Sequence, residues 1–96
     1  MVSSSSPNNK VAVVTGSSSG IGYETALMLA RNGFLTYATM RNLSKGENIK
    51  SIAAKENLPL RITQLDVTDD VSVKNAVQTM SSETGRINVL VNNELI

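Results

Sequence analysis

The sequence predicts an α/β fold, in which one parallel sheet is covered by helices on both faces. Four apolar, β-branched segments have the length of strands, and three segments with a helical spacing of apolar residues lie between them. The connections between these segments are short. Strands that alternate with helices are joined by right-handed crossovers, so the four strands are expected to run parallel in a single sheet.

The first and the fourth strand are expected to be buried, whereas the third has alternating apolar positions. The first, residues 10–15, is a continuous run of apolar and β-branched residues, which is typical of the interior of a parallel sheet. The other three are predicted at residues 34–39, 60–65 and 87–91. The resulting β-α-β-α-β-α-β order, with strand order 3-2-1-4, is one half of a doubly wound, Rossmann-type fold with one further strand.

The helices are predicted at residues 21–32, 45–57 and 71–83. Ile21 belongs to the apolar positions of the first helix, and Gly33 is a natural C-terminal stop. Ser44 is the candidate N-cap of the second helix, and Thr68 or Asp69 is the candidate for the third. Short polar side chains suit these positions because they accept hydrogen bonds from the free N–H groups of a helix start.

The composition excludes several classes of function. With 41% hydrophobic residues, 18% charged residues and a net charge of +1, the chain lacks the basic surface that nucleic acid or an anionic membrane requires. It has neither cysteine nor histidine, which removes disulfides, thiolate nucleophiles, Ser-His pairs and most metal sites. No apolar stretch approaches the ~20 residues of a membrane helix. We therefore expect no metal, nucleic-acid or membrane partner.

The most informative segment is a Gly-x-x-x-Gly-x-Gly sequence between the first strand and the first helix. Gly16 permits a sharp turn out of the strand, Gly20 lets the backbone approach a pyrophosphate, and Gly22 allows the helix to pack closely. Ser18 and Ser19 add hydroxyl groups. The free N–H groups and the positive end of the helix dipole then face a bound anion. This context, a buried strand before and a helix after, favours a dinucleotide site over a solvent loop.

Three motifs, TGSSSGIG, LDVTD and INVLVNN, occur in this order at successive strand positions and resemble the N-terminal half of a short-chain dehydrogenase/reductase over residues 10–93. The residues that match the family's diphosphate loop are Gly16, Ser18, Ile21 and Gly22. The resemblance implies that Asp66, with the backbone beside Val67, hydrogen-bonds the adenine ring of the coenzyme. Asn92 matches the first asparagine of the family's Asn-Asn-Ala-Gly motif, which supports the central sheet and the adenine-ribose region.

The end of the second strand favours NADP over NAD as the coenzyme. NAD sites place Asp or Glu on the ribose 2′-hydroxyl about 20 residues past the glycines, and that position is Met40 here. Arg41 follows, and its guanidinium suits the 2′-phosphate of NADP. Residues 37–42 also resemble family members that prefer NADP and act on steroids or retinol. Many of these relatives have a basic residue where this chain has Ser19.

The family's catalytic residues are not found in the 96 residues. The family's general acid is a tyrosine, which is tuned by a lysine four positions later and assisted by a serine. Neither Tyr23 nor Tyr37 is followed by a lysine at that spacing. We interpret the chain as the coenzyme-binding part of an oxidoreductase that transfers hydride between NADP(H) and a carbonyl or alcohol, truncated before the catalytic segment. Because a missing acid or base costs ~10²–10⁴-fold, we expect the chain alone to be inactive.

Two other functions remain open. The chain could be a non-catalytic module that binds NADP or pairs with another copy, or with a relative, through the open edge of its last strand. It could also bind another adenine ligand on the same type of fold, such as an adenosyl methyl donor. Residues 1–9 are polar and are expected to form a disordered leader without an export signal. Residues 10–96 then form one incomplete dinucleotide-binding half-domain, which we expect in the cytoplasm.

Overall fold

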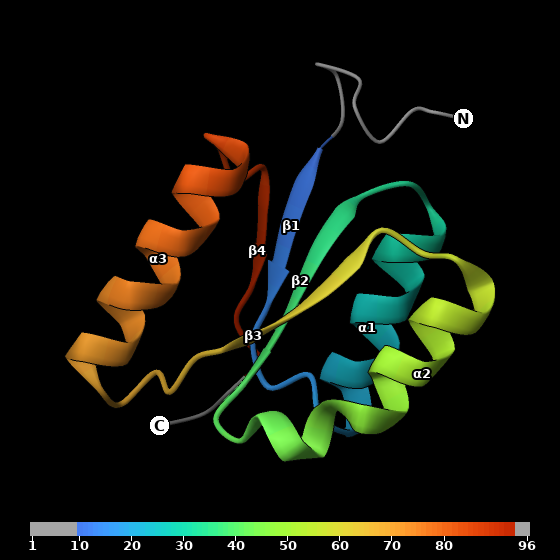
Figure 1. The fold of residues 1–96 in the computed structure, drawn as a ribbon, viewed down its shortest axis with the longest axis horizontal. Coiled ribbons are helices and arrows are strands. Elements are labelled where there is room, and N and C mark those ends of the chain that lie inside the picture. Colours follow the sequence, from blue (N-terminus) through green and yellow to red (C-terminus); the bar gives the residue numbers. More distant parts are fainter. Residues whose placement is uncertain (1–9, 94–96) are drawn as a thin grey trace.

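The computed structural model describes residues 10–93, and the predicted leader lies outside them. It confirms the α/β class, because four parallel strands in the order β3-β2-β1-β4 form one sheet. Helices α1 and α2 cover one face and α3 covers the other (Figure 1). The strands are β1 (Val11–Val14), β2 (Leu35–Met40), β3 (Leu60–Gln64) and β4 (Val89–Val91). The helical elements are α1 (Gly20–Arg31), the 3₁₀ turn η2 (Leu43–Gly46), α2 (Glu47–Glu56) and α3 (Asp70–Thr84).

Strand β1 is the centre of the core. All of its residues are buried, and it pairs with β2 on one side and β4 on the other. Val11 and Val13 pack on the α3 side together with Tyr37, whereas Val14 packs on the α1 and α2 side together with Ala38. Successive side chains of a strand point to opposite faces, so one short strand contributes to both cores. The uninterrupted apolar run of β1 is therefore a doubly buried strand, as predicted, whereas the prediction that β4 is buried was wrong, since Leu90 is 64% exposed.

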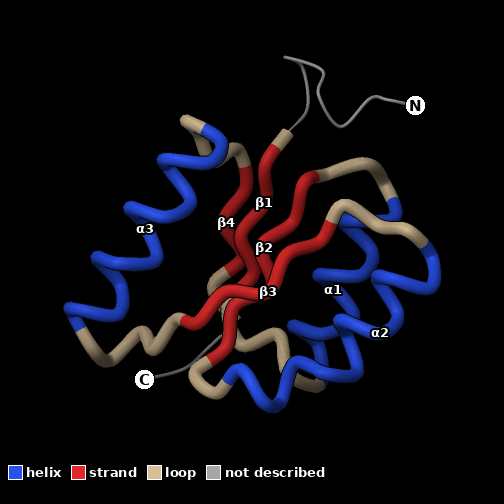
Figure 2. The backbone as a smooth tube through the Cα atoms, in the orientation of Figure 1, coloured by secondary structure: helices blue, strands red, loops and turns tan. Residues whose placement is uncertain are grey.

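The start of the second helix differs from the prediction. Residues 43–46 form the turn η2, and the α-helix begins only at Glu47. Ser44 as N-cap was wrong, because Asn42 caps the turn. The Asn42 Oδ1 atom accepts hydrogen bonds from the Ser44 N–H at 3.0 Å and from the Ser44 hydroxyl at 2.7 Å. Figure 2 shows the turn continuing into α2 beyond the end of β2.

Gly46 explains why the turn lies so close to the sheet. It is buried at the end of η2, and a Cβ atom there would lie 3.0 Å from the Met40 sulfur and 3.1 Å from the Ile62 side chain. Because glycine has no side chain, the turn packs directly on β2 and β3 before the α-helix begins. This contact fixes the segment that follows Arg41.

The other helix ends follow the prediction more closely, but one apolar residue of the first helix is not buried. Asp69, the second of the two candidate residues, caps α3, and its Oδ1 accepts a hydrogen bond from the Val71 N–H at 3.0 Å. Gly33 has a φ of 89°, as expected for a C-terminal stop after α1. Ile21, by contrast, is 74% exposed. It lies in the first turn of α1, which starts beyond the end of β1, so no strand covers its side chain.

Helix α1 approaches the end of β1 so closely that Gly22 has no room for a side chain. A Cβ atom at Gly22 would lie 2.1 Å from the carbonyl oxygen of Gly16 and 2.9 Å from the Nδ2 atom of Asn93. Gly16 follows β1 and Asn93 follows β4, so Gly22 sets the distance between the helix start and two strand ends.

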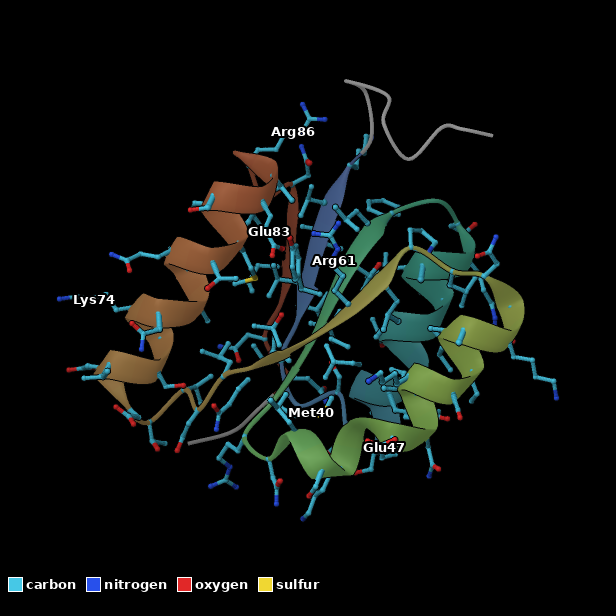
Figure 3. All side chains as sticks on the ribbon, in the orientation of Figure 1. Met40, Glu47, Arg61, Lys74, Glu83 and Arg86 are labelled. Atoms are coloured by element: carbon cyan, nitrogen blue, oxygen red, sulfur yellow. The ribbon has the colours of Figure 1, made fainter. Side chains whose placement is uncertain are left out.

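A polar cluster on the α3 side joins that helix to two strands. The hydroxyl of buried Tyr37 donates to Glu83 Oε1 at 2.5 Å, and Arg61 Nη1 donates to the same oxygen at 2.8 Å. Figure 3 shows Arg61 and Glu83 between α3 and the sheet. Burial, together with the Glu83 carboxylate, raises the pKa of Tyr37 to about 12. The hydrogen bonds from Tyr37 and Arg61 lower the pKa of Glu83.

We expect Gly22→Ala to lower the free energy of unfolding by about 1–3 kcal/mol, the usual effect of overpacking. The backbone carbonyl of Gly16 cannot turn away as a flexible side chain would. Alanine also gains up to about 1 kcal/mol of helix propensity, which offsets only part of this loss. Urea unfolding followed by circular dichroism measures the difference, and an unchanged or higher midpoint would show that the helix start can move.

The Tyr37 cluster predicts a loss of stability at high pH. The folded-state pKa of Tyr37, about 12, lies above its ordinary value of 10.0, so its contribution is complete below pH 10 and is lost as the pH rises towards 12. At pH 7 we expect Tyr37→Phe to be less stable by about 0.5–1.5 kcal/mol, one hydrogen bond's worth. Denaturant titrations of both proteins should converge between pH 10 and pH 12. A constant difference over this interval would contradict the assignment.

Candidate functional site

Buried hydrogen bonds fix the loop that leaves β1. The Ser17 hydroxyl donates to the Val14 carbonyl at 2.7 Å, and the Ser17 N–H donates to the Thr39 carbonyl at 3.0 Å. The Thr39 hydroxyl donates to the same Val14 carbonyl at 3.0 Å. The loop is thereby held across the ends of β1 and β2. Sequence reasoning missed Ser17, because nothing in a run of three serines marks the one that is buried.

The glycines then turn the chain into α1. Gly16 and Gly20 have φ values of 63° and 64°, in the left-handed region that favours glycine. The N-cap residue, Ser19, makes no capping hydrogen bond with its side chain, and the first turn of α1 holds no acidic residue. The helix start therefore presents its N–H groups and the positive end of its dipole without an acidic side chain of its own. This arrangement suits an anionic ligand.

A hollow of about 520 Å³ opens beside this helix start, and we call it the central hollow. Four of the predicted site residues line it, namely Gly16, Ser18, Ser19 and Arg41. Four further residues complete the lining, namely Met40, Asn42, Lys45 and Asn93. The charged members of this lining are the two cations, so the described walls of the hollow are basic.

Two smaller hollows adjoin the central one at the carboxyl end of the sheet. The serine hollow, about 430 Å³, is lined by Ser18, Ser19, Ser44, Lys45, Glu47 and Asn48. The aspartate hollow, about 290 Å³, is lined by Arg41, Gln64, Asp66, Asp69, Val71, Ser72 and Asn75. The central hollow shares Arg41 with the aspartate hollow and Lys45 with the serine hollow. An elongated ligand could therefore extend from one to the next.

Asp66 is held in a fixed orientation at the end of β3. Its Oδ1 atom accepts hydrogen bonds from the Thr68 N–H at 3.0 Å and from the Thr68 hydroxyl at 2.7 Å. These bonds, and to a smaller extent the charge of Arg41, lower the pKa of Asp66. The carboxylate is therefore ionised at neutral pH. Both Thr68 bonds use Oδ1, which leaves Oδ2 as the acceptor for a ligand.

Thr15 ties the end of β4 to the end of β1. Its hydroxyl donates to Asn92 Oδ1 at 3.1 Å and accepts a hydrogen bond from the Asn93 N–H at 2.7 Å. Asn92 is exposed and supports this connection, whereas Asn93 lines the central hollow. Asn92, the predicted site residue, thus helps to position Asn93 at the wall of the hollow.

The remaining predicted site residues divide into two groups. Gly20, Ile21 and Gly22 form the first turn of α1, beside the central hollow. The side chain of Val67 packs against the core on the α3 side, and Val67 lines none of the three hollows. Lys45 and Asn93 were missed. Asn93 stood beside a predicted residue, but the position of Lys45 depends on η2, which the sequence did not reveal.

The chemistry of the site rests on backbone N–H groups, hydroxyls, one carboxylate and two cations. In the described part of the chain, no group of three or more His, Cys, Asp or Glu is arranged to hold a metal ion. Among residues 10–93, no helix is both long and apolar enough to cross a membrane.

Comparison with known proteins agrees with this geometry. The sequence profile of the family described as short chain dehydrogenase matches residues 10–94. The chain is 40% identical over 84 residues to a 3-ketodihydrosphingosine reductase of Bacteroides thetaiotaomicron, covering 88% of this chain and 28% of that protein. It is 36% identical over 86 residues to retinol dehydrogenase 12 of Mus musculus, covering 88% of this chain and 27% of the relative. The chain thus spans less than a third of the length of these relatives.

Solved structures show the same arrangement of elements. The menthone neomenthol reductase of Mentha piperita superposes with a TM-score of 0.82 at 30% identity, covering 93% of this chain and 32% of that one. A variant of actinorhodin polyketide ketoreductase, determined with NADPH, superposes with a TM-score of 0.83 at 26% identity, covering 91% and 33%.

The family uses NAD(P) as its coenzyme, and the matched residues include the whole glycine loop and the ends of all four strands. The chain therefore belongs to the short-chain dehydrogenase family, of which it represents the N-terminal, coenzyme-binding region.

Proposed function

We propose that this chain binds NADP(H), in preference to NAD(H), across its three hollows. The proposal rests on the two residues at the end of β2, Met40 and Arg41. Met40, where a NAD site would place a carboxylate, is buried, and the exposed Arg41 lines both the central and the aspartate hollows. A guanidinium offers a 2′-phosphate a pair of parallel hydrogen bonds, which a ribose hydroxyl cannot match.

Each part of the coenzyme has a group of complementary chemistry. The start of α1 and the hydroxyls of Ser18 and Ser19 would hold the diphosphate. Asp66, ionised and with Oδ2 available, would accept a hydrogen bond from the adenine amino group. Asn92 would act indirectly, by holding Asn93 at the wall of the central hollow. The nicotinamide itself supplies the hydride.

The activity of the whole protein is proposed from its family. We propose an oxidoreductase that moves a hydride between NADP(H) and a carbonyl or alcohol. Within the 96 residues, no tyrosine is followed by a lysine four positions later. The chain by itself is therefore expected to bind coenzyme without turning over a substrate, since no proton donor is placed for the carbonyl oxygen.

A second proposed function is pairing with another copy of this chain through β4. In the described sheet β4 is hydrogen-bonded to β1 alone, and residues 87–91 carry no charge that would discourage pairing. Leu90 pairs in register with Val13, whose side chain faces α3, yet Leu90 is 64% exposed. Two such edges related by a twofold axis are self-complementary.

The coenzyme preference is tested with Arg41→Ala. We expect NADPH binding to weaken roughly 10- to 100-fold, corresponding to about 1.5–3 kcal/mol for hydrogen bonds to a charged group, whereas NADH binding stays unchanged. Calorimetric titration of both coenzymes measures this, and Arg31→Ala, which removes an exposed guanidinium paired with Glu56, is the matched control. Equal affinities of the parent chain for NADPH and NADH would refute the preference. Tight binding of an adenosyl methyl donor, with no binding of either coenzyme, would favour the alternative function in which the fold binds another adenine ligand.

The pairing is tested with Leu90→Lys. We expect the parent chain to self-associate in sedimentation experiments and Leu90→Lys to be monomeric, because a charge on the strand edge opposes pairing. Met28→Lys, which places the same charge at a 55% exposed position of α1, should associate like the parent chain. A parent chain that sediments as a monomer at every concentration would exclude this function.

A further inference from the structure

The structure assigns Lys45 as a second residue that determines coenzyme preference, acting on the 2′-phosphate from the part of the central hollow that adjoins the serine hollow. This inference rests on the proposed binding of NADP(H) and deepens it. Lys45 belongs to none of the motifs in the sequence, and only its place in the fold brings it into the site.

Arg41 and Lys45, the two cations of the central hollow, each line a different second hollow. Arg41 lines the central and aspartate hollows, whereas Lys45 lines the central and serine hollows. Of the three hollows described, the central one is lined by both residues. A doubly charged phosphate held there would meet a guanidinium on one side and an ammonium on the other, with the hydroxyls of Ser18 and Ser19 nearby. A ribose hydroxyl in the same place carries no charge to attract the lysine.

The backbone on both sides of this pair is fixed before any ligand binds. The Gln64 side chain donates a hydrogen bond to the Arg41 carbonyl at 3.1 Å, which ties Arg41 to the end of β3. The Lys45 N–H donates to the Asn42 carbonyl at 3.0 Å, and the next residue, Gly46, is buried against the sheet. Figure 3 labels Met40 and Glu47, which mark the two ends of this segment. The two cations are thus presented by a pinned turn, and only their side chains have to move.

The surrounding charges leave Lys45 available for an anion. Within residues 10–93 the salt bridges are Arg31–Glu56 and Arg61–Glu83, and neither involves the two cations. Asp66 and Asp69 line the aspartate hollow beside Arg41, and the charge of Arg41 contributes to the low pKa of Asp66. On the other side, Glu47 is the acidic residue that lines the serine hollow with Lys45. The central hollow between them has no acidic lining residue among those described.

A purely structural role for Lys45 is disfavoured by its position. Its side chain has no described salt bridge, and it lies two residues before Glu47, where α2 begins. The positive end of the helix dipole disfavours a cation at this place. Removal of the charge should therefore leave the melting temperature unchanged or slightly higher. A loss of NADPH affinity without a loss of stability would separate ligand binding from folding.

The test compares Lys45→Gln with Lys50→Gln. Lys50 is exposed on α2 and lines none of the three hollows, so its substitution makes the same change in net charge away from the site. We expect Lys45→Gln to weaken NADPH binding roughly 5- to 20-fold, to leave NADH binding within twofold, and to reduce the salt dependence of NADPH binding. Lys50→Gln should change neither affinity by more than twofold, and Lys45→Arg should retain most of the preference.

The outcomes distinguish this inference from the function on which it rests. If the parent chain prefers NADPH and Lys45→Gln keeps the same ratio of affinities, the role of Lys45 is refuted while the proposed coenzyme stands. If Lys45→Gln and Lys50→Gln weaken NADPH equally, the effect is one of net charge and the assignment is also refuted. If the folded parent chain binds neither coenzyme, the proposed function fails and Lys45 with it.

Discussion

The contact between Gly22 and the carbonyl of Gly16 decides the geometry of the whole site. Because no side chain separates them, α1 begins directly at the end of β1 and its free N–H groups face the edge where all four parallel strands end. The buried hydrogen bond of Ser17 and the partly buried ones of Thr15 hold the loop and the end of β4 against the end of β1. The glycine loop is thus tied to the strand ends where it forms one wall of the central hollow.

Charges are used differently inside and outside the site. Away from the hollows, Arg31 and Arg61 are paired with carboxylates in exposed salt bridges, which add little to stability in water. At the hollows, Arg41 and Lys45 take part in neither salt bridge of the described residues. The chain's net charge of +1 therefore hides a local excess of positive charge in the lining of the central hollow, where Arg41 and Lys45 are the charged residues. Such an excess attracts an anion over a short range, since salt screens it within about 10 Å.

The two faces of the sheet are covered by different numbers of helices. Helices α1 and α2 cover one core, whereas α3 alone covers the other and is anchored through Tyr37, Glu83 and Arg61 (Figure 1). This anchor lies over β2 and β3, so β4 receives little cover and Leu90 is left exposed. The hollows at the carboxyl end of the sheet and the exposed Leu90 of β4 are therefore at different places on one sheet.

The sequence alone determined the elements and their order. Long apolar runs such as residues 10–15 and the glycines around α1 impose strong local preferences, and alternating strands and helices admit few topologies. It also predicted that Gly16, Ser18, Ser19 and Arg41 lie close together, because the ends of adjacent parallel strands meet at one edge, and all four line the central hollow. In these cases spacing along the chain was enough to fix position in space.

Only the tertiary structure decided which residue in a run of identical residues is buried and which one lines a hollow. It buried Ser17 while leaving Ser18 and Ser19 at the hollow, and it placed Asn93 rather than Asn92 at the wall. It also turned a predicted helix start into η2, because Gly46 packs on Met40 and Ile62 from distant strands. That turn places Lys45 at the hollow that Arg41 also lines. Such choices depend on packing between segments far apart in the chain, and no local pattern encodes them.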